Sequence, residues 1–230
     1  MSNSSWRLIS ALVWVSTSFA GAAWCAPPGH VELASEIARN GTTIAETSYL
    51  LEHDGRTYRI TETSKGRGIL ALRGTTRRTS RGIVSAQGLK PVEFTDERSG
   101  RGTARASFDW DMKTVTLQYK GEPRTEPLPA QAHDRLAWLF DFAFAPARRE
   151  AAFDLFDGRG KSHHVYASDG RERLKTPLGE FEALRFVRGS GEERTEIWLA
   201  SELNLLPLRV LVVEKDGTRY EQVTTKITPP

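Results

Sequence analysis

Two histidines and two aspartates are the side chains best suited to acid-base or metal chemistry in this sequence. His163 and His164 are adjacent, and Asp154 and Asp157 precede them. The histidines lie in a segment rich in strand-forming residues. Neighbouring side chains of a strand point to opposite faces, so the two imidazoles cannot both bind one metal ion. We favour one imidazole facing the interior and the other facing solvent; an enzyme would require all four side chains to converge in one pocket.

The sequence offers no other catalytic signature. His133 next to Asp134 looks like a general-base pair, but Asp134 is already explained as the N-cap of a predicted helix. No nucleophile elbow, zinc-binding H-E-x-x-H helix, Walker loop or dinucleotide-binding glycine motif occurs. We therefore expect a non-catalytic protein with no cofactor and no metal.

Five arginines form the strongest basic cluster: Arg67, Arg73, Arg77, Arg78 and Arg81. Aromatic residues do not alternate with them, as they do in proteins that bind single-stranded nucleic acid. The chain of 230 residues is also nearly balanced in charge, with 32 Lys and Arg against 29 Asp and Glu. We therefore predict a solvated sheet face and no nucleic-acid partner. Contact with anionic envelope lipid is the alternative for this cluster.

Large aromatic side chains are the most suggestive group for ligand binding. Lining the concave side of a curved sheet, they could hold a lipid or another hydrophobic molecule, and the same residue types would also fill an ordinary core. The candidate ligand-binding residues are Tyr58, Phe94, Phe108, Trp110, Trp138, Phe140, Phe186 and Trp198.

Residues 1–26 are typical of a secretory signal peptide. They contain one basic residue, Arg7, and no acidic residue, and an apolar run extends from Leu8 to Ala23. Serines and a threonine interrupt this run, which is shorter than a membrane span requires. Cys25 could mark a lipidated precursor, but the bulky Trp24 before it argues against lipidation. We predict a periplasmic mature chain with no transmembrane span.

Short segments rich in β-branched and aromatic residues, separated by turn dipeptides, predict an all-β, mainly antiparallel domain. In one segment Ala104, Ala106 and Phe108 alternate with polar residues, as in a strand with one wet face. The dipeptides favour two-residue hairpin turns, because both central residues tolerate positive φ. They are Asn40-Gly41, Asp54-Gly55, Asp157-Gly158, Asp169-Gly170 and Asp216-Gly217.

One helix is predicted from Asp134 to Phe144, with apolar residues at helical spacing. We expect it to cover or plug a curved sheet or half-open β-barrel. The stretch Gly121 to Pro129 holds three prolines and is predicted to be a loop. There is no internal repeat and no long linker, so residues 27–230 are predicted to form a single, monomeric domain.

Several short motifs occur in order along nearly all of the mature chain: Gly88-Leu89-Lys90-Pro91, Phe94, Phe108-Asp109-Trp110, Asp134-Arg135-Leu136, Thr176-Pro177-Leu178-Gly179-Glu180-Phe181, Ile197-Trp198-Leu199-Ala200, Leu206-Pro207-Leu208-Arg209 and Asp216-Gly217. Together they resemble a family of uncharacterised Gram-negative envelope proteins, domain of unknown function 3108. Two departures are His133, where the family usually has Gln, and Ala137, where it commonly has Ser.

The resemblance implies an exported β protein similar to the half-open barrels that carry lipoproteins or lipids across the periplasm. It implies no activity for any named residue. The leading hypothesis is a non-catalytic periplasmic protein that binds a lipid or other hydrophobic molecule in an apolar groove. The alternatives are a structural module that docks an envelope protein through its sheet edges, and an enzyme of unknown class.

Overall fold

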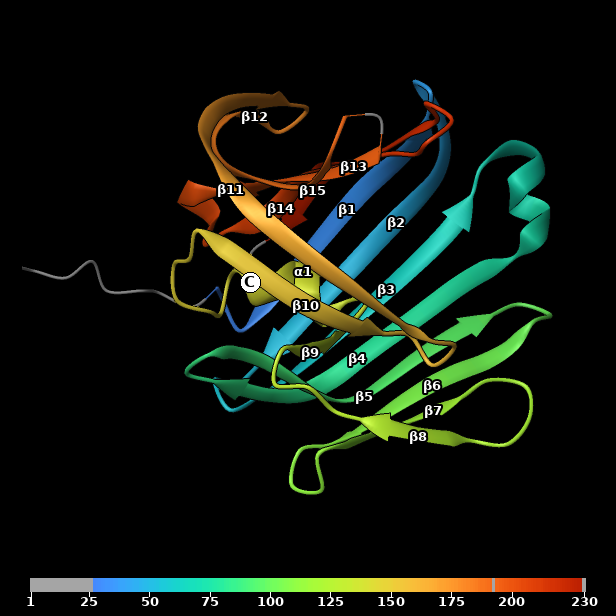
Figure 1. The fold of residues 1–230 in the computed structure, drawn as a ribbon. Helices are drawn as coiled ribbons and strands as arrows, with labels where there is room; N and C mark the ends of the chain where they lie inside the picture. The colour runs from blue at the N-terminus through green and yellow to red at the C-terminus, as the bar shows by residue number, and fades with distance from the viewer. Residues whose placement is uncertain (1–26, 192, 229–230) are drawn as a thin grey trace, which may run out of the picture.

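The computed structural model describes residues 27–191 and 193–228, and these form one curved 15-stranded sheet around a short helix (Figure 1). The predicted signal peptide, residues 1–26, lies outside the described residues. The fold class predicted from the sequence is confirmed. Within the described ranges, no helix is long and apolar enough to cross a membrane.

The strands follow one another along the chain with short connections. The first half holds β1 (His30–Arg39), β2 (Thr42–His53), β3 (Thr57–Gly66), the 3₁₀ helix η1 (Gly68–Arg73), β4 (Thr75–Ser85), β5 (Gly88–Arg98), β6 (Gly102–Asp109), β7 (Thr114–Gln118) and β8 (Arg124–Pro127). The second half holds β9 (Ala132–Asp134), α1 (Ala137–Asp141), β10 (Glu150–Phe156), β11 (Lys161–Thr176), β12 (Gly179–Ser190), β13 (Glu193–Ala200), the 3₁₀ helix η2 (Ser201–Leu203), β14 (Leu206–Val213) and β15 (Arg219–Thr228).

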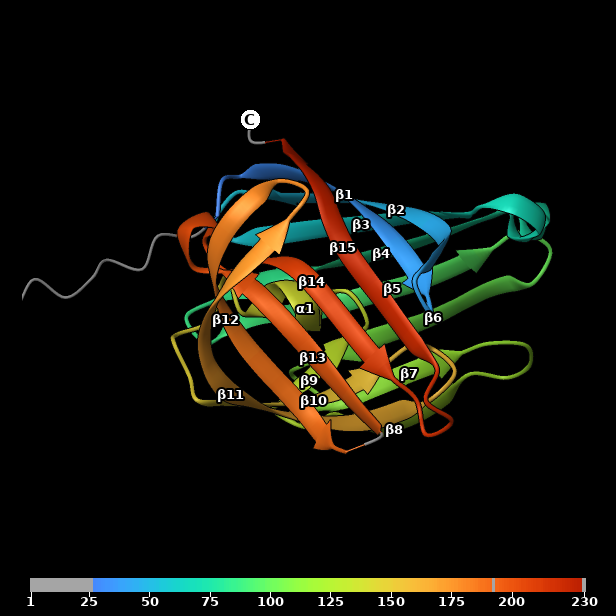
Figure 2. The ribbon, with the colours of Figure 1, turned by 90° about the horizontal axis from the view of Figure 1, so that it is seen from above.

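The sheet consists of two antiparallel meanders that join in the middle. From the middle of the sheet, strands β1 to β8 follow one another in order to one edge. On the other side of the middle, strands β15 to β10 follow one another in reverse order toward the second edge. The first and last strands pair with each other, with Leu33 opposite Ile227. The second edge is β9, which pairs with β10 in parallel. The sheet curls so that α1 lies inside the ring of strands (Figure 2), as expected for a half-open barrel.

Four of the five predicted turn dipeptides connect successive strands, but Asp169-Gly170 does not. It lies inside β11, where the register with β12 shifts between Ser168 and Arg171. Gly170 has φ of 91°, which suits a β-bulge as well as a hairpin turn. The bulge bends β11, and the outer half of the β11–β12 hairpin curls away from the barrel wall (Figure 1).

Two other predictions need correction. The helix is shorter than the predicted span from Asp134 to Phe144, because Asp134 still belongs to strand β9 and residues 142–144 form turns. Beyond the helix the aromatic side chains diverge: Phe142 packs on Phe186, and Phe144 packs edge-on against His53. The predicted loop from Gly121 to Pro129 contains the edge strand β8; prolines are tolerated at such an edge.

Burial divides the apolar residues into two clusters. The main core fills the concave side of the sheet and includes all of the buried side chains of α1 except Asp141. A smaller cluster lies under the curled β11–β12 hairpin and is built around Trp198 and Leu208. Alternation along the strands explains the division, since Leu199 belongs to the main core and its neighbours Trp198 and Ala200 belong to the small cluster.

Asp134 ties the start of α1 to the sheet. Its Oδ1 accepts hydrogen bonds from the backbone N–H groups of Leu136 and Ala137, at 2.7 and 2.9 Å. Its Oδ2 accepts one from the Ser80 hydroxyl at 2.5 Å, and Ser80 in turn bonds the hydroxyl of Tyr58 at 3.0 Å. The predicted N-cap is wrong in its position, because Leu136 is the N-cap residue of α1 and Asp134 ends strand β9. The Asp134 carboxylate instead binds the backbone N–H groups of the turn that leads into the helix.

Asp141 ties the end of α1 to strand β5. Its Oδ1 accepts the Leu89 N–H at 2.6 Å and lies 3.2 Å from His133 Nε2, while its Oδ2 accepts from Arg148 at 2.6 Å. Burial alone would raise the pKa of Asp141, but the hydrogen bonds and charges of His133 and Arg148 outweigh it and hold the pKa below its ordinary value. The carboxylate therefore stays ionised in the core.

Replacing Asp134 by alanine is expected to lower the free energy of unfolding by about 2–4 kcal/mol, because two backbone N–H groups and the Ser80 hydroxyl lose a buried partner. Asp109→Ala is the matched control. Asp109 accepts from the N–H groups of Asp111 and Met112 in the same local geometry, but it is exposed. Urea unfolding of both variants measures the difference; equal losses would contradict a buried capping role.

The free energy of unfolding should also depend on pH through the titration of Asp134. Burial raises its pKa from 3.8 to about 6, with Ser80 and the two backbone donors opposing the shift. Between pH 4 and 6 the folded state retains a proton that the unfolded state loses, so this group's contribution to stability falls as pH rises and is constant above pH 6. Relative to the wild type, Asp134→Asn should gain about 3 kcal/mol over that window. A difference independent of pH in denaturation curves would contradict the shift.

Candidate functional site

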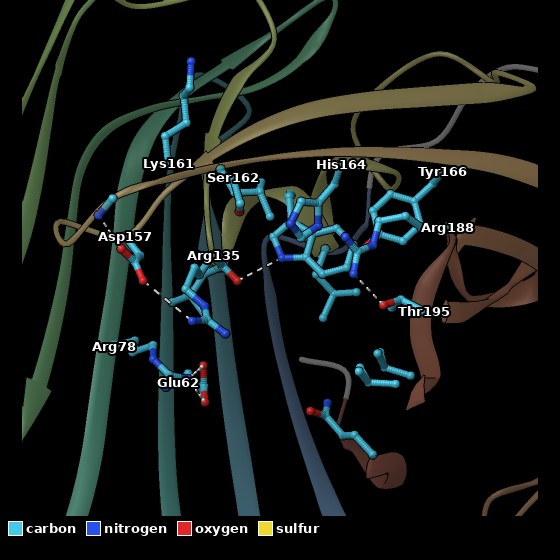
Figure 3. A pocket seen from close by; sticks show the side chains of 18 of the residues that line it. Glu62, Arg78, Arg135, Asp157, Lys161, Ser162, His164, Tyr166, Arg188 and Thr195 are labelled. Carbon is cyan, nitrogen blue, oxygen red and sulfur yellow. Dashed lines mark hydrogen bonds and ion pairs between the residues drawn. The ribbon is translucent and has the colours of Figure 1, made fainter. Parts of the chain in front are cut away.

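A cavity with a volume of about 710 Å³ lies on the concave side of the sheet beside α1 (Figure 3). Strands β1 to β4 form one wall, and the β10–β11 hairpin and strands β12 to β15 form the others. Part of the lining is apolar: Ile37, Leu136, Leu139, Leu155, Val210 and Val212. Two aromatic rings extend it, because Trp138 stacks on Tyr166 with centroids 5.2 Å apart and planes 12° from parallel.

Of the eight aromatic residues predicted to bind a ligand, only Trp138 lines this cavity. Five are buried in the main core, and Trp110 packs against that core from a partly buried position. Trp198 lies apart in the small cluster, between the guanidinium groups of Arg185 and Arg209. The five in the core are Tyr58, Phe94, Phe108, Phe140 and Phe186.

The rest of the lining is charged, with five cations and two carboxylates. Arg78 binds both oxygens of Glu62, at 2.8 and 2.9 Å, so this pair is neutral overall. Arg159 binds the fully buried Asp96 at 2.7 Å. The cations are Arg78, Arg135, Arg159, Lys161 and Arg188, and the carboxylates are Glu62 and Asp157. The lining carries a formal excess of three positive charges.

Arg188 differs from the other arginines of the cavity in having no carboxylate partner within residues 27–191 and 193–228. It is half-buried, its Nη2 donates to the Thr195 hydroxyl at 3.3 Å, and its buried Nε has no hydrogen-bond partner there. Arg135 is only weakly neutralised, since its Nη1 lies 3.7 Å from Asp157 and its side chain is half exposed. These two guanidinium groups supply most of the uncompensated positive charge on the lining of the cavity.

His164 responds to that charge. Its pKa falls from 6.5 to about 4, first through burial and then through the positive charges of Arg188 and Arg135. The imidazole is therefore neutral at physiological pH. Its buried Nδ1 has no hydrogen-bond partner among the described side chains and backbone groups. A neutral imidazole can donate one hydrogen bond to a ligand in the cavity.

The four candidate catalytic residues do not converge. Cross-strand pairing puts His163 opposite Asp154 and His164 opposite Phe153, so the two histidines face opposite sides of the hairpin, as predicted. His163 Nδ1 pairs with Asp154 at 3.0 Å outside the cavity, whereas His164 and Asp157 line it. The hypothesis that these four form one pocket is wrong. Within the described residues, no group of three or more His, Cys, Asp or Glu side chains could hold a metal ion.

The predicted arginine cluster is also divided between the two faces of the sheet. Arg77 and Arg81 are exposed, as expected for a solvated face. Arg78, between them, points into the cavity instead, because strand residues alternate. Arg67 and Arg73 flank η1 at the end of the β3–β4 hairpin.

Sequence reasoning missed Arg188 and Arg135, which give the cavity its charge. A signal for Arg188 was present: Phe186 and Arg188 share one face of β12, and Phe186 belongs to the core. A charged residue in register with core residues is expensive to bury unless it has a function or a partner. Glu62 gives the same signal, in register with Tyr58 and Ile60 on β3.

Comparison with known proteins gives the family. The family model described as "Protein of unknown function (DUF3108)" matches residues 34–224. This chain belongs to the DUF3108 family. No curated protein matches it. The DUF3108 match includes the strands of both meanders, α1 and every residue that lines the cavity.

One solved structure supports the fold of this DUF3108 protein. It is similar to a β-barrel-like protein of domain of unknown function DUF1849 from Brucella abortus, at 8% identity and a TM-score of 0.55, over 87% of this chain and 98% of that chain. Such low identity supports the fold alone. A predicted lipoprotein from Parabacteroides distasonis is similar at a TM-score of 0.36 and 13% identity, over 89% and 99% of the two chains. A predicted exported protein with a YmcC-like fold from Bacteroides fragilis gives 0.39 and 11%, over 89% and 100%.

One DUF3108 motif has a clear structural cause. Gly88 has φ of 120°, and a Cβ atom there would lie 2.2 Å from Asp141 Oδ1. Only glycine lets strand β5 approach the carboxylate closely enough for the Leu89 N–H to bind it. Farther along the same motif, the Pro91 carbonyl accepts the indole N–H of Trp110 at 2.7 Å. The glycine motif therefore holds the end of α1 against β5, and Trp110 ties the end of β6 to the same strand.

The effect of the cavity's positive charges can be measured through the pKa of His164. Arg188→Met should raise the pKa of His164 from about 4 toward 6.5, because one of the two neighbouring positive charges is removed while the burial remains. NMR titration of the imidazole measures the shift. Arg171→Met is the control, since Arg171 is exposed and pairs with Glu182 away from the cavity. An unchanged pKa in Arg188→Met would contradict an electropositive cavity.

Proposed function

We propose that this DUF3108 protein is an exported, non-catalytic binding protein whose cavity holds an amphiphile with an anionic head group. The observation that carries the proposal is Arg188, a half-buried cation without a carboxylate partner in the described ranges, next to an apolar lining. An unpaired guanidinium in a partly dry site is costly unless an anion completes it. The hypothesis from the sequence, a hydrophobic molecule in an apolar groove, thereby becomes an amphiphile with an anionic head group.

The apolar part of the cavity suits an acyl chain. Its volume of about 710 Å³ lies inside the range of about 300–1,000 Å³ that is usual for small-molecule sites. Leu136, Leu139 and the stacked rings of Trp138 and Tyr166 form a continuous surface along α1 and β11. Methylene groups that leave water for this surface gain about 0.8 kcal/mol each.

The charged part suits a carboxylate or a phosphate. Arg188 offers a planar guanidinium whose buried Nε has no hydrogen-bond partner among the described residues, and Arg135 and the neutral His164 lie on the same lining. Guanidinium groups bind both carboxylates and phosphates through paired N–H donors. A fatty acid and a lysophospholipid share this chemistry, and the binding experiment separates them.

The exported location and the non-catalytic character are the remaining parts of the proposal. The composition of residues 1–26 supports a signal peptide and thus a periplasmic location. The separation of His163 from His164 removes the one catalytic constellation that the sequence suggested. Cell fractionation, with the N-terminal mass of the exported chain, tests the location and also reports whether Cys25 is retained or lipidated.

Binding should depend on both halves of the ligand. We expect the exported protein to bind palmitate or lysophosphatidylglycerol, and palmityl alcohol about tenfold or more weakly, because the alcohol cannot form the charged hydrogen bonds. Arg188→Met should weaken binding of the anions by a similar factor and leave the alcohol unchanged. Fluorescent-probe displacement and native mass spectrometry measure these affinities, and the preferred anion identifies the head group.

Two control variants separate the contributions. Arg171→Met removes an exposed arginine outside the cavity and should bind like the wild type. Val210→Trp fills the apolar lining and should weaken all three ligands. A protein that binds none of them and is recovered empty would overturn the proposed function; equal binding of palmitate and its alcohol would overturn the anionic head group alone.

A further inference from the structure

A second feature lies away from the cavity, at the end of the β3–β4 hairpin. The 3₁₀ helix η1 connects these two strands and projects beyond the body of the barrel (Figures 1 and 2). Ile69 is 81% exposed and Leu72 is 86% exposed, the two highest values among the exposed large apolar residues in the described ranges. Side chains this apolar are rarely presented together to water without a use.

The geometry of η1 places the two side chains together. A 3₁₀ helix has three residues per turn, so residues i and i+3 lie one above the other. Ile69 and Leu72 have this spacing and share the outer side, while Leu70 and Ala71 are partly buried. Leu70 packs back onto the hairpin, since a Cβ atom at Gly66 would lie 2.5 Å from its carbonyl oxygen.

The base of the tip is held firmly. The Arg67 N–H donates to the Ile44 carbonyl at 2.7 Å, and its guanidinium binds Glu46 and Glu36 on the neighbouring strands, at 2.5 and 2.9 Å. The other end of η1 closes with the Gly74 N–H donating to the Ala71 carbonyl at 3.1 Å. The apolar pair is therefore presented on a fixed support and not on a loose loop.

The charges around the tip are mainly positive. Both carboxylates at its base are bound to Arg67, whereas Lys65 and Arg73, which flank η1, form no ion pair with any described residue. An apolar pair flanked by free cations matches the interface of an anionic bilayer, where aliphatic side chains enter the acyl region and the cations meet phosphates.

From this arrangement we propose that the η1 tip, residues 65–73, docks the protein on an anionic membrane surface, with Ile69 and Leu72 inserted among the lipids. The tip lies outside the lining of the cavity, so docking stands independently of the proposed ligand. One hairpin tip with two aliphatic anchors and a few charges gives reversible binding to the surface.

The test is co-sedimentation of the exported protein with vesicles. Vesicles containing phosphatidylglycerol should bind it, pure phosphatidylcholine vesicles should bind it much less, and added salt should release it. The double variant Ile69→Ser with Leu72→Ser should reduce binding about tenfold or more, and Arg73→Glu should reduce it about tenfold on anionic vesicles only. Circular dichroism and urea unfolding check that each variant is folded, and the cavity affinity for palmitate, measured on the same variants, separates the two proposals.

Met112→Ser is the matched control. Met112 is also exposed, at 72%, but it lies on the β6–β7 turn and should leave vesicle binding unchanged. The proposal would be overturned if the wild-type protein did not bind anionic vesicles, or if the double variant bound them as well as the wild type does. Self-association through the tip, seen as a dimer in analytical ultracentrifugation that the double variant abolishes, would replace the membrane with a second copy of the chain and also overturn it.

Discussion

Two buried carboxylates at the ends of α1 are the interactions on which the rest of the structure depends. Asp134 bonds the start of the helix and Ser80 of β4, and Asp141 bonds the end of the helix to Leu89 of β5. A helix of five residues has almost no stability of its own. It stays inside the barrel because these bonds replace the missing helical ones, and its position then shapes both the core and the cavity wall.

The interior changes character along the strands. Near α1 the inward side chains are apolar, as Tyr58 and Ile60 are on β3; the next inward residue, Glu62, is buried and pairs with Arg78. Strand β12 shows the same change from Phe186 to Arg188. The cavity lies at this boundary, so strands alone supply both apolar residues and the charged Glu62, Arg78 and Arg188. The connections between elements add Arg135, Asp157 and Arg159.

The sequence was sufficient for the fold because strands and turns are encoded locally, by alternation and by residues that accept positive φ. It failed where one local signal serves two structures: Asp-Gly at 169–170 forms a bulge, since a bulge also accepts a glycine with positive φ. Five of the predicted aromatic residues lie in the main core and Trp138 lines the cavity, whereas Trp198 lies in the small cluster on the other face of its strand. Residue type alone could not distinguish core from cavity. The charge of the cavity depends on which of its cations lack a carboxylate partner. The curvature of the sheet, which brings Arg188 and Arg135 into the lining of one cavity, has no local signature in the sequence.

The pairing of β1 with β15 places the first and last described strands side by side in the middle of the sheet. Hydrogen bonds such as that from Thr225 to the Ala34 carbonyl join residues 191 positions apart. The strands of the first meander can pair with one another without β15, but the two meanders join only when β15 has paired with β1, and contacts of such long range form slowly. The closure of the continuous sheet therefore depends on the C-terminal strand of the described residues, and a change that weakens β15 would separate the two halves of the cavity wall.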